Sequence, residues 1–178
     1  RLAKPRRGQL ADSPSVVADA RHGLLLRRPG FDAKLPGLRL LHDPVWSRER
    51  LAALGLDTAS TVTLVAHRLG KRAVLRITGA HGTHYARLRP VTSGSGRQAY
   101  DQHLALFEAL DGAEQLAIPR PLGFDPEIGL ALFDSLPVTP PAFRGLDGYR
   151  AVASVMRAVA LLQSLTLPAP PHTAAGEL

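Results

Sequence analysis

The amino-acid sequence predicts an α+β fold in which a five-stranded antiparallel sheet carries one helix inserted after its third strand. Three observations lead to this prediction. Three strand-like runs follow one another through short connections that contain glycine. A single amphipathic helix comes next, and two further strand-like runs follow it. Strands joined by so few residues pair as antiparallel neighbours, because a parallel pair needs a crossover of about a dozen residues.

The first three strands are predicted at residues 61–66, 73–78 and 83–89. The first of them is rich in β-branched residues, which favour strands. The third alternates, so two sets of side chains are expected on opposite sides of it. One set consists of Tyr85, Arg87 and Arg89, and the other of Ala86 and Leu88.

The helices are predicted from apolar spacing and from signals at their ends. A first helix is expected to begin with Ser47 as its N-cap and to end at Gly55. The inserted helix covers residues 97–110, and a last helix covers residues 149–165. The inserted helix has one apolar stripe that we expect to be buried. That stripe consists of Ala99, His103, Leu106, Phe107 and Leu110.

Two more strands, at residues 122–124 and 129–133, complete the predicted sheet. Prolines between residues 137 and 141 indicate a linker before the last helix. Near the N-terminus, residues 16–20 and 24–28 flank His22 and Gly23, a pattern that indicates a short hairpin.

The positive charge of the chain lies mostly at its beginning. The 178 residues carry a net charge of +7, and residues 1–40 hold nine Lys and Arg against three Asp, which gives +6. One interpretation is an arm that binds nucleic acid. The other is a solvated extension, which we favour because Phe31 is the only aromatic residue there. Nucleic acid is therefore an unlikely partner.

Composition also bears on the compartment. The chain has no cysteine, and no apolar run approaches the length of about 20 residues that spans a bilayer. We therefore expect a cytoplasmic protein with no membrane partner. The first residue is Arg1 and the only methionine is Met156, so we expect a fragment of a longer protein.

Six stretches carry a family resemblance, at residues 68–76, 85–88, 99–103, 118–125, 129–137 and 161–165. Together they resemble the aminoglycoside phosphotransferase and choline kinase family. The resemblance implies a protein-kinase-like N-lobe at residues 41–137, preceded by a basic extension at 1–40. Residues 138–178 would then hold a linker and the first helix of a truncated C-lobe.

The resemblance also implies a site for ATP. Kinase-like folds place a cation on the third strand to hold phosphates, oriented by an acid on the inserted helix. Arg87 stands at the position of the cation and Gln102 at that of the acid. The alternatives are that Arg87 is a solvent-facing strand residue and Gln102 a polar edge of its helix. The turn that would cover the phosphates consists of Gly70 and Lys71. The segment whose backbone would bind adenine consists of Phe133, Asp134, Ser135 and Leu136.

The chemistry itself is expected to lie outside this chain. No H-x-D-x-x-x-x-N stretch is present, so the catalytic base and the Mg²⁺ ligands of a kinase are missing from these residues. The resemblance implies that the parent protein transfers a phosphoryl group to the hydroxyl of a small-molecule acceptor, and that this chain alone is inactive. The alternative is a non-catalytic kinase-like module that binds a nucleotide or a protein. The oligomeric state is not indicated.

Two other functions have less support in the sequence. Residues 94–99 match the glycine pattern of dinucleotide-binding proteins, but the strands before them are linked by hairpins rather than by crossovers. Metal binding has no support, because the seven histidines show no ligand spacing; His81 and His84 are expected to be exposed residues at a turn.

Overall fold

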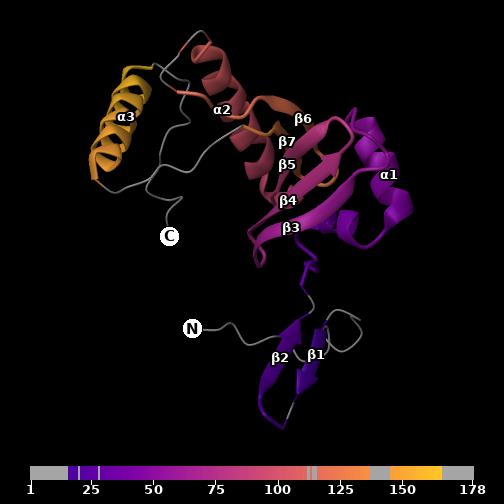
Figure 1. Cartoon of the computed structure of the whole chain (residues 1–178). Coiled ribbons are helices and arrows are strands. Elements are labelled where there is room, and N and C mark those ends of the chain that lie inside the picture. The colour runs from indigo at the N-terminus through magenta and orange to yellow at the C-terminus, as the bar shows by residue number, and fades with distance from the viewer. Residues whose placement is uncertain are drawn as a thin grey trace.

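The computed structural model describes residues 16–19, 21–27, 29–111, 113, 116–136 and 145–165. Its main sheet has five antiparallel strands in the order β3-β4-β5-β7-β6 (Figure 1). The strands are β3 (Thr61–Arg68), β4 (Arg72–Gly79), β5 (Gly82–Leu88), β6 (Pro121–Asp125) and β7 (Leu130–Asp134). The predicted α+β class and the five-stranded antiparallel sheet are thus confirmed.

Helix α2 (Ser95–Ala109) lies between β5 and β6 in the chain, as the sequence predicts. A 3-10 turn, η2 (Val91–Ser93), precedes it. The predicted stripe of α2 is half-buried, and only Leu110, just after the helix, is buried. The strand before α2 has antiparallel neighbours on both sides, β4 and β7. The dinucleotide interpretation therefore lacks the parallel strands that it requires.

One face of the sheet carries the hydrophobic core. Its most buried side chains come from alternate positions of β4, β5 and β7, as the period of two in a strand requires. The 3-10 helix η1 (Pro36–Leu41) and helix α1 (Pro44–Ala53) supply the other side of the core. The buried cluster includes Leu35, Leu38, Leu40, Leu51, Ala73, Leu75, Ile77, Ala86, Leu88, Ile128, Leu130 and Leu132.

The N-terminal part of the chain contributes to this core. Leu35 is completely buried, and Leu38 and Leu40 are almost so. These residues precede position 41, where we expected the sheet domain to begin. Residues 35–40 therefore pack with the sheet, although they lie within the stretch that carries most of the positive charge.

The start of α1 differs from the prediction. Asp43, not Ser47, is the N-cap: its Oδ1 accepts a hydrogen bond from the Trp46 amide at 3.1 Å, and Pro44 occupies the first turn. Ser47 is buried within the helix. Proline suits the first helical position because its missing N–H has no partner there in any helix. Gly55, with φ +76°, follows the end of the helix as predicted.

The hairpin near the N-terminus is confirmed. Strands β1 (Val16–Asp19) and β2 (Leu24–Arg27) pair antiparallel in a separate two-stranded sheet (Figure 1). The last helix, α3 (Gly145–Ser164), begins four residues before the predicted start. The expected proline linker at residues 137–141 lies outside the described residues. No helix in the described ranges is both long and apolar enough to cross a membrane.

Candidate functional site

The face of the sheet opposite the core contains a cavity of about 410 Å³. Strands β4, β5 and β7 form its floor, while α2 and the segment before β6 contribute to its wall. The lining residues are Val74, Tyr85, Ala86, Arg87, His103, Pro119, Phe133, Asp134 and Leu136. Cavities of this size and mostly apolar lining are typical of sites for small molecules.

Arg87 supplies the positive charge of the cavity. It lies between Val74 of β4 and Ala131 of β7, and its guanidinium carbon is 5.5 Å from the centre of the Phe133 ring. Partial burial lowers the pKa of Arg87, and the like charges of Arg89 and Arg72 lower it further. An arginine nevertheless remains charged at neutral pH, because its ordinary pKa lies far above neutrality. In the described part of the chain, no acid forms an ion pair with Arg87.

His103 supports the wall of the cavity. Its Nε2 donates a hydrogen bond to the carbonyl of Pro119 at 2.7 Å, because a carbonyl can only accept. Its ring lies edge-on to Phe133 with the ring centres 4.6 Å apart. These contacts join α2, the segment before β6 and β7. Sequence reasoning assigned His103 to a buried stripe and missed its place at the cavity.

The segment after β7 forms the rim of the cavity. Asp134 is the last residue of the strand; its amide donates to the Arg120 carbonyl at 2.9 Å. The Ser135 amide donates to the Asp134 carboxylate, also at 2.9 Å. Leu136 then lines the cavity, whereas Ser135 does not. The structure thus brings together Arg87, Phe133, Asp134 and Leu136, four of the residues selected from the sequence.

The other selected residues lie apart from the cavity lining. Gly70 and Lys71 form the turn between β3 and β4, where Gly70 has φ +65°. The amide of Gly70 donates to Asp32 at 2.5 Å, so this donor is already engaged. Lys71 is exposed at the same turn. Gln102 is exposed on α2, and within the described ranges it has no polar contact with Arg87.

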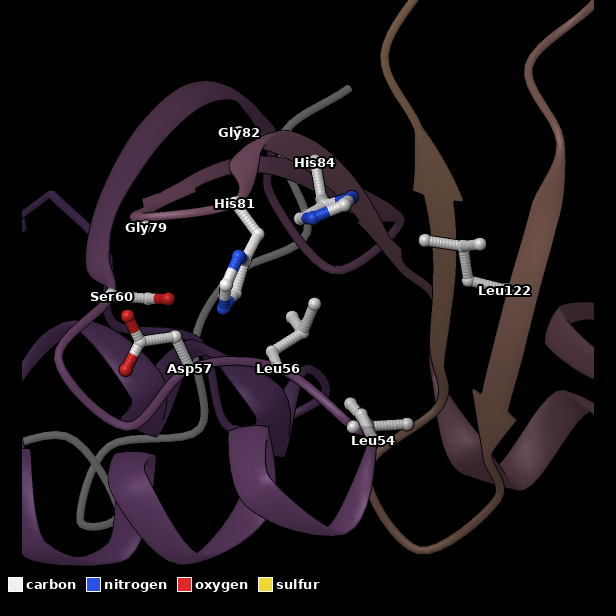
Figure 2. A pocket seen from close by; sticks show the side chains of 10 residues that line it. Leu54, Leu56, Asp57, Ser60, Gly79, His81, Gly82, His84 and Leu122 are labelled. Atoms are coloured by element: carbon white, nitrogen blue, oxygen red, sulfur yellow. The ribbon is translucent and has the colours of Figure 1, made fainter.

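A second cavity, of about 390 Å³, lies beside the turn between β4 and β5 (Figure 2). It is bounded by the segment after α1 and by the turn between β4 and β5. Figure 2 shows the rings of His81 and His84 extending toward the hollow above Leu56. His81 is exposed as expected, but the side chain of His84 is only 18% exposed, so the prediction of an exposed turn residue is wrong for His84.

Asp57 is the acid of this second cavity, and its carboxylate is already used. It accepts from the Ala59 amide at 2.9 Å and from the Ala80 amide at 3.4 Å, and these two bonds lower the pKa of Asp57. The bond from the Ala80 amide attaches the segment after α1 to the turn between β4 and β5. No group of three or more His, Cys, Asp or Glu among the described residues is placed to hold a metal ion.

Compared with known proteins, the chain matches no family model, no curated protein and no solved structure. The residues at the first cavity are therefore the basis for assigning a function.

Proposed function

We propose that the chain binds ATP in the cavity beside Arg87 and is the kinase-like, nucleotide-binding N-lobe of a phosphotransferase that acts on a small-molecule hydroxyl. The observation that carries the proposal is the arrangement of one cation, an apolar wall and a strand end around a single cavity. A cytoplasmic location, where ATP is available, accords with it.

Each part of the cavity suits a part of the nucleotide. Val74, Phe133 and Leu136 offer apolar surface to a planar base. The strand ladder of β7 ends at Asp134, so the backbone of residues 135 and 136 lies outside the sheet's hydrogen bonds at the rim. Arg87 offers a guanidinium to phosphate oxygens, which it can bind in a bidentate manner.

The order of elements also supports the proposal. The sheet has one helix inserted after its third strand, and Arg87 lies on that third strand. In kinase-like folds the cation that holds the phosphates has this position. Gln102 departs from the pattern, since it carries no charge. In its place, Arg87 stacks on Phe133, and the aromatic ring can orient the guanidinium by a cation–π contact.

ATP binding, measured by isothermal titration calorimetry, tests the proposal. Arg87→Ala is expected to weaken binding about tenfold, because it removes a charge-assisted hydrogen bond, while Arg87→Lys should weaken it less. Arg48→Ala is the matched control, since Arg48 is exposed on α1, the helix that packs against the core face. Equal affinities of the Arg87→Ala and wild-type proteins, or no binding of ATP by either, would overturn the proposal.

Turnover is a separate test, because binding does not require chemistry. Phosphate release from ATP by the chain alone is expected to stay at the uncatalysed rate, since a phosphotransferase needs a base and metal ligands in addition to this cavity. ATP binding without turnover even in the complete protein would leave the non-catalytic nucleotide-binding module.

A further inference from the structure

Four arginines lie together on the open face of the sheet. We name Arg68, Arg72, Arg87 and Arg89 the arginine strip. Arg68 of β3 is directly opposite Arg72 of β4. Ala73 of β4 is paired with Leu88 of β5, and both side chains are completely buried on the core face. Arg72 directly precedes Ala73, and Arg89 directly follows Leu88. Since successive side chains of a strand point to opposite faces, the strip lies on the face that carries Arg87.

The strip has an unfavourable arrangement of charge. Like charges directly opposite each other on neighbouring strands destabilise a sheet. Three arginines outside the strip have acidic partners within the described chain: Arg39 pairs with Asp43, Arg50 with Asp125 and Glu127, and Arg97 with Asp101. No such ion pair involves a residue of the strip within the described ranges.

Arg89 is the least exposed arginine of the strip. Its Nε is buried, and it has no hydrogen-bond acceptor among the described residues. A buried donor of a charged group without an acceptor is costly, so such donors usually have a partner. Arg89 also contributes to the crevice between the sheet and α2 that contains Arg87, Gly96 and Tyr100.

The position of the strip suggests which anion it takes. Neighbouring strands are about 4.8 Å apart, so the strip extends roughly 10 Å from β5 to the edge strand β3. One end of it, Arg87, lines the cavity that we assign to the base. A ligand bound there would direct its phosphates along the other three arginines. Guanidinium groups bind phosphate oxygens in pairs, which suits a short chain of phosphates.

We propose that the arginine strip binds the polyphosphate tail of the nucleotide, so that affinity rises with the number of phosphates. The assignment of the tail to a nucleotide rests on the proposed function, but the binding of phosphates by the strip does not. Arg68, Arg72 and Arg89 would each add contacts to those of Arg87. The order of affinity is then ATP, ADP and AMP.

Inorganic tripolyphosphate is the direct probe, because it has the phosphate chain without a base. Calorimetry in EDTA and low salt is expected to detect its binding, since the arginines themselves supply the countercharge. Arg72→Ala and Arg68→Ala are expected to weaken binding about tenfold each, and Arg48→Ala to leave it unchanged. Arg68 and Arg72 are exposed, so the variants Arg68→Ala and Arg72→Ala should fold. Circular dichroism checks the folding of these two variants and of Arg89→Ala.

The possible results separate the strip from the base site. Absence of tripolyphosphate binding, or equal binding by the strip variants and wild type, would overturn the proposal that the arginine strip binds phosphates, even if ATP binds. Tripolyphosphate binding that is as tight as ATP binding would support the strip and contradict the base site. Tighter binding of an oligothymidylate than of ATP would overturn the assignment to a nucleotide tail.

Discussion

Asp32 illustrates how one side chain connects distant parts of this fold. Its carboxylate is 4% exposed and accepts hydrogen bonds from the Gly70 amide and from the Lys34 amide, and His67 Nε2 is 3.1 Å away. Burial opposes its ionisation, but the two amides and His67 outweigh burial and lower the pKa of Asp32. The segment before η1 is thereby attached to the turn between β3 and β4.

Asp32→Ala is expected to lower the free energy of unfolding at neutral pH by about 2 kcal/mol, because the half-buried Gly70 amide and the half-buried His67 ring lose their acceptor. Urea denaturation followed by circular dichroism measures this. Asp111→Ala is the control, since Asp111 is exposed just after α2. A loss no larger than that of the control would contradict the role given to Asp32.

The same substitution predicts a pH dependence. The pKa of Asp32 is about 3.8 in the unfolded chain and lower in the folded protein. The carboxylate therefore contributes fully to stability above pH 3.8, and this contribution is lost as the pH falls through the lower pKa of the folded protein. The difference in stability between wild type and Asp32→Ala should therefore shrink as pH decreases below 3.8. A difference that stays constant over this range would contradict the prediction.

At the scale of elements, Arg50 joins α1 to the sheet in addition to the core contacts of Leu51. Arg50 Nη1 lies 3.3 Å from Asp125 of β6, and its Nη2 contacts Glu127 in the turn between β6 and β7. The guanidinium is also 5.5 Å from the Trp46 ring. Asp125 is only 11% exposed, so this ion pair is screened by solvent less than a surface pair.

Arg50→Ala is expected to cost about 1–2 kcal/mol of unfolding free energy, since a half-buried pair lies between surface and buried pairs in strength. Arg48→Ala, two positions away on the exposed side of α1, should cost less than about 0.5 kcal/mol. A double-mutant cycle with Asp125→Ala measures the coupling. Zero coupling energy would show that the pair does not attach α1.

At the scale of the whole molecule, the core and α3 differ in how far their apolar side chains are buried. Leu132 is completely buried between the sheet and η1, α1. In contrast, α3 exposes an apolar stripe within the described chain, with Met156 62% exposed. The side chains of that stripe are Val152, Val155, Met156, Val159 and Leu162. Stability should therefore depend on the sheet and its N-terminal cover rather than on α3.

Leu132→Ala is expected to cost about 2–5 kcal/mol, because it leaves a cavity in a packed core. Met156→Ala should change the unfolding free energy by less than about 0.5 kcal/mol. Thermal and urea denaturation of both variants measure the difference. A large loss with Met156→Ala would mean that α3 packs against the rest of the molecule in solution.

The local sequence pattern was sufficient to predict most of the helices and strands. Alternation in residues 83–89 predicted that Arg87 and Ala86 lie on opposite faces, and the structure confirms it. The N-cap was mispredicted because Ser47 and Asp43 are both good caps, and the choice depends on which one precedes the turn that packs Leu51 into the core. His84 was mispredicted because strand pairing places it beside Asp134, a residue far away in the sequence.

By itself, the sequence determined the order of strands and helices, because alternation, apolar spacing and short glycine connections act between near neighbours. It also determined which side of β5 carries Arg87. Only the tertiary structure decided that Asp32 meets Gly70 and that Leu35 joins the core. The physical reason is that strand register and packing join residues whose separation along the chain carries no local signal.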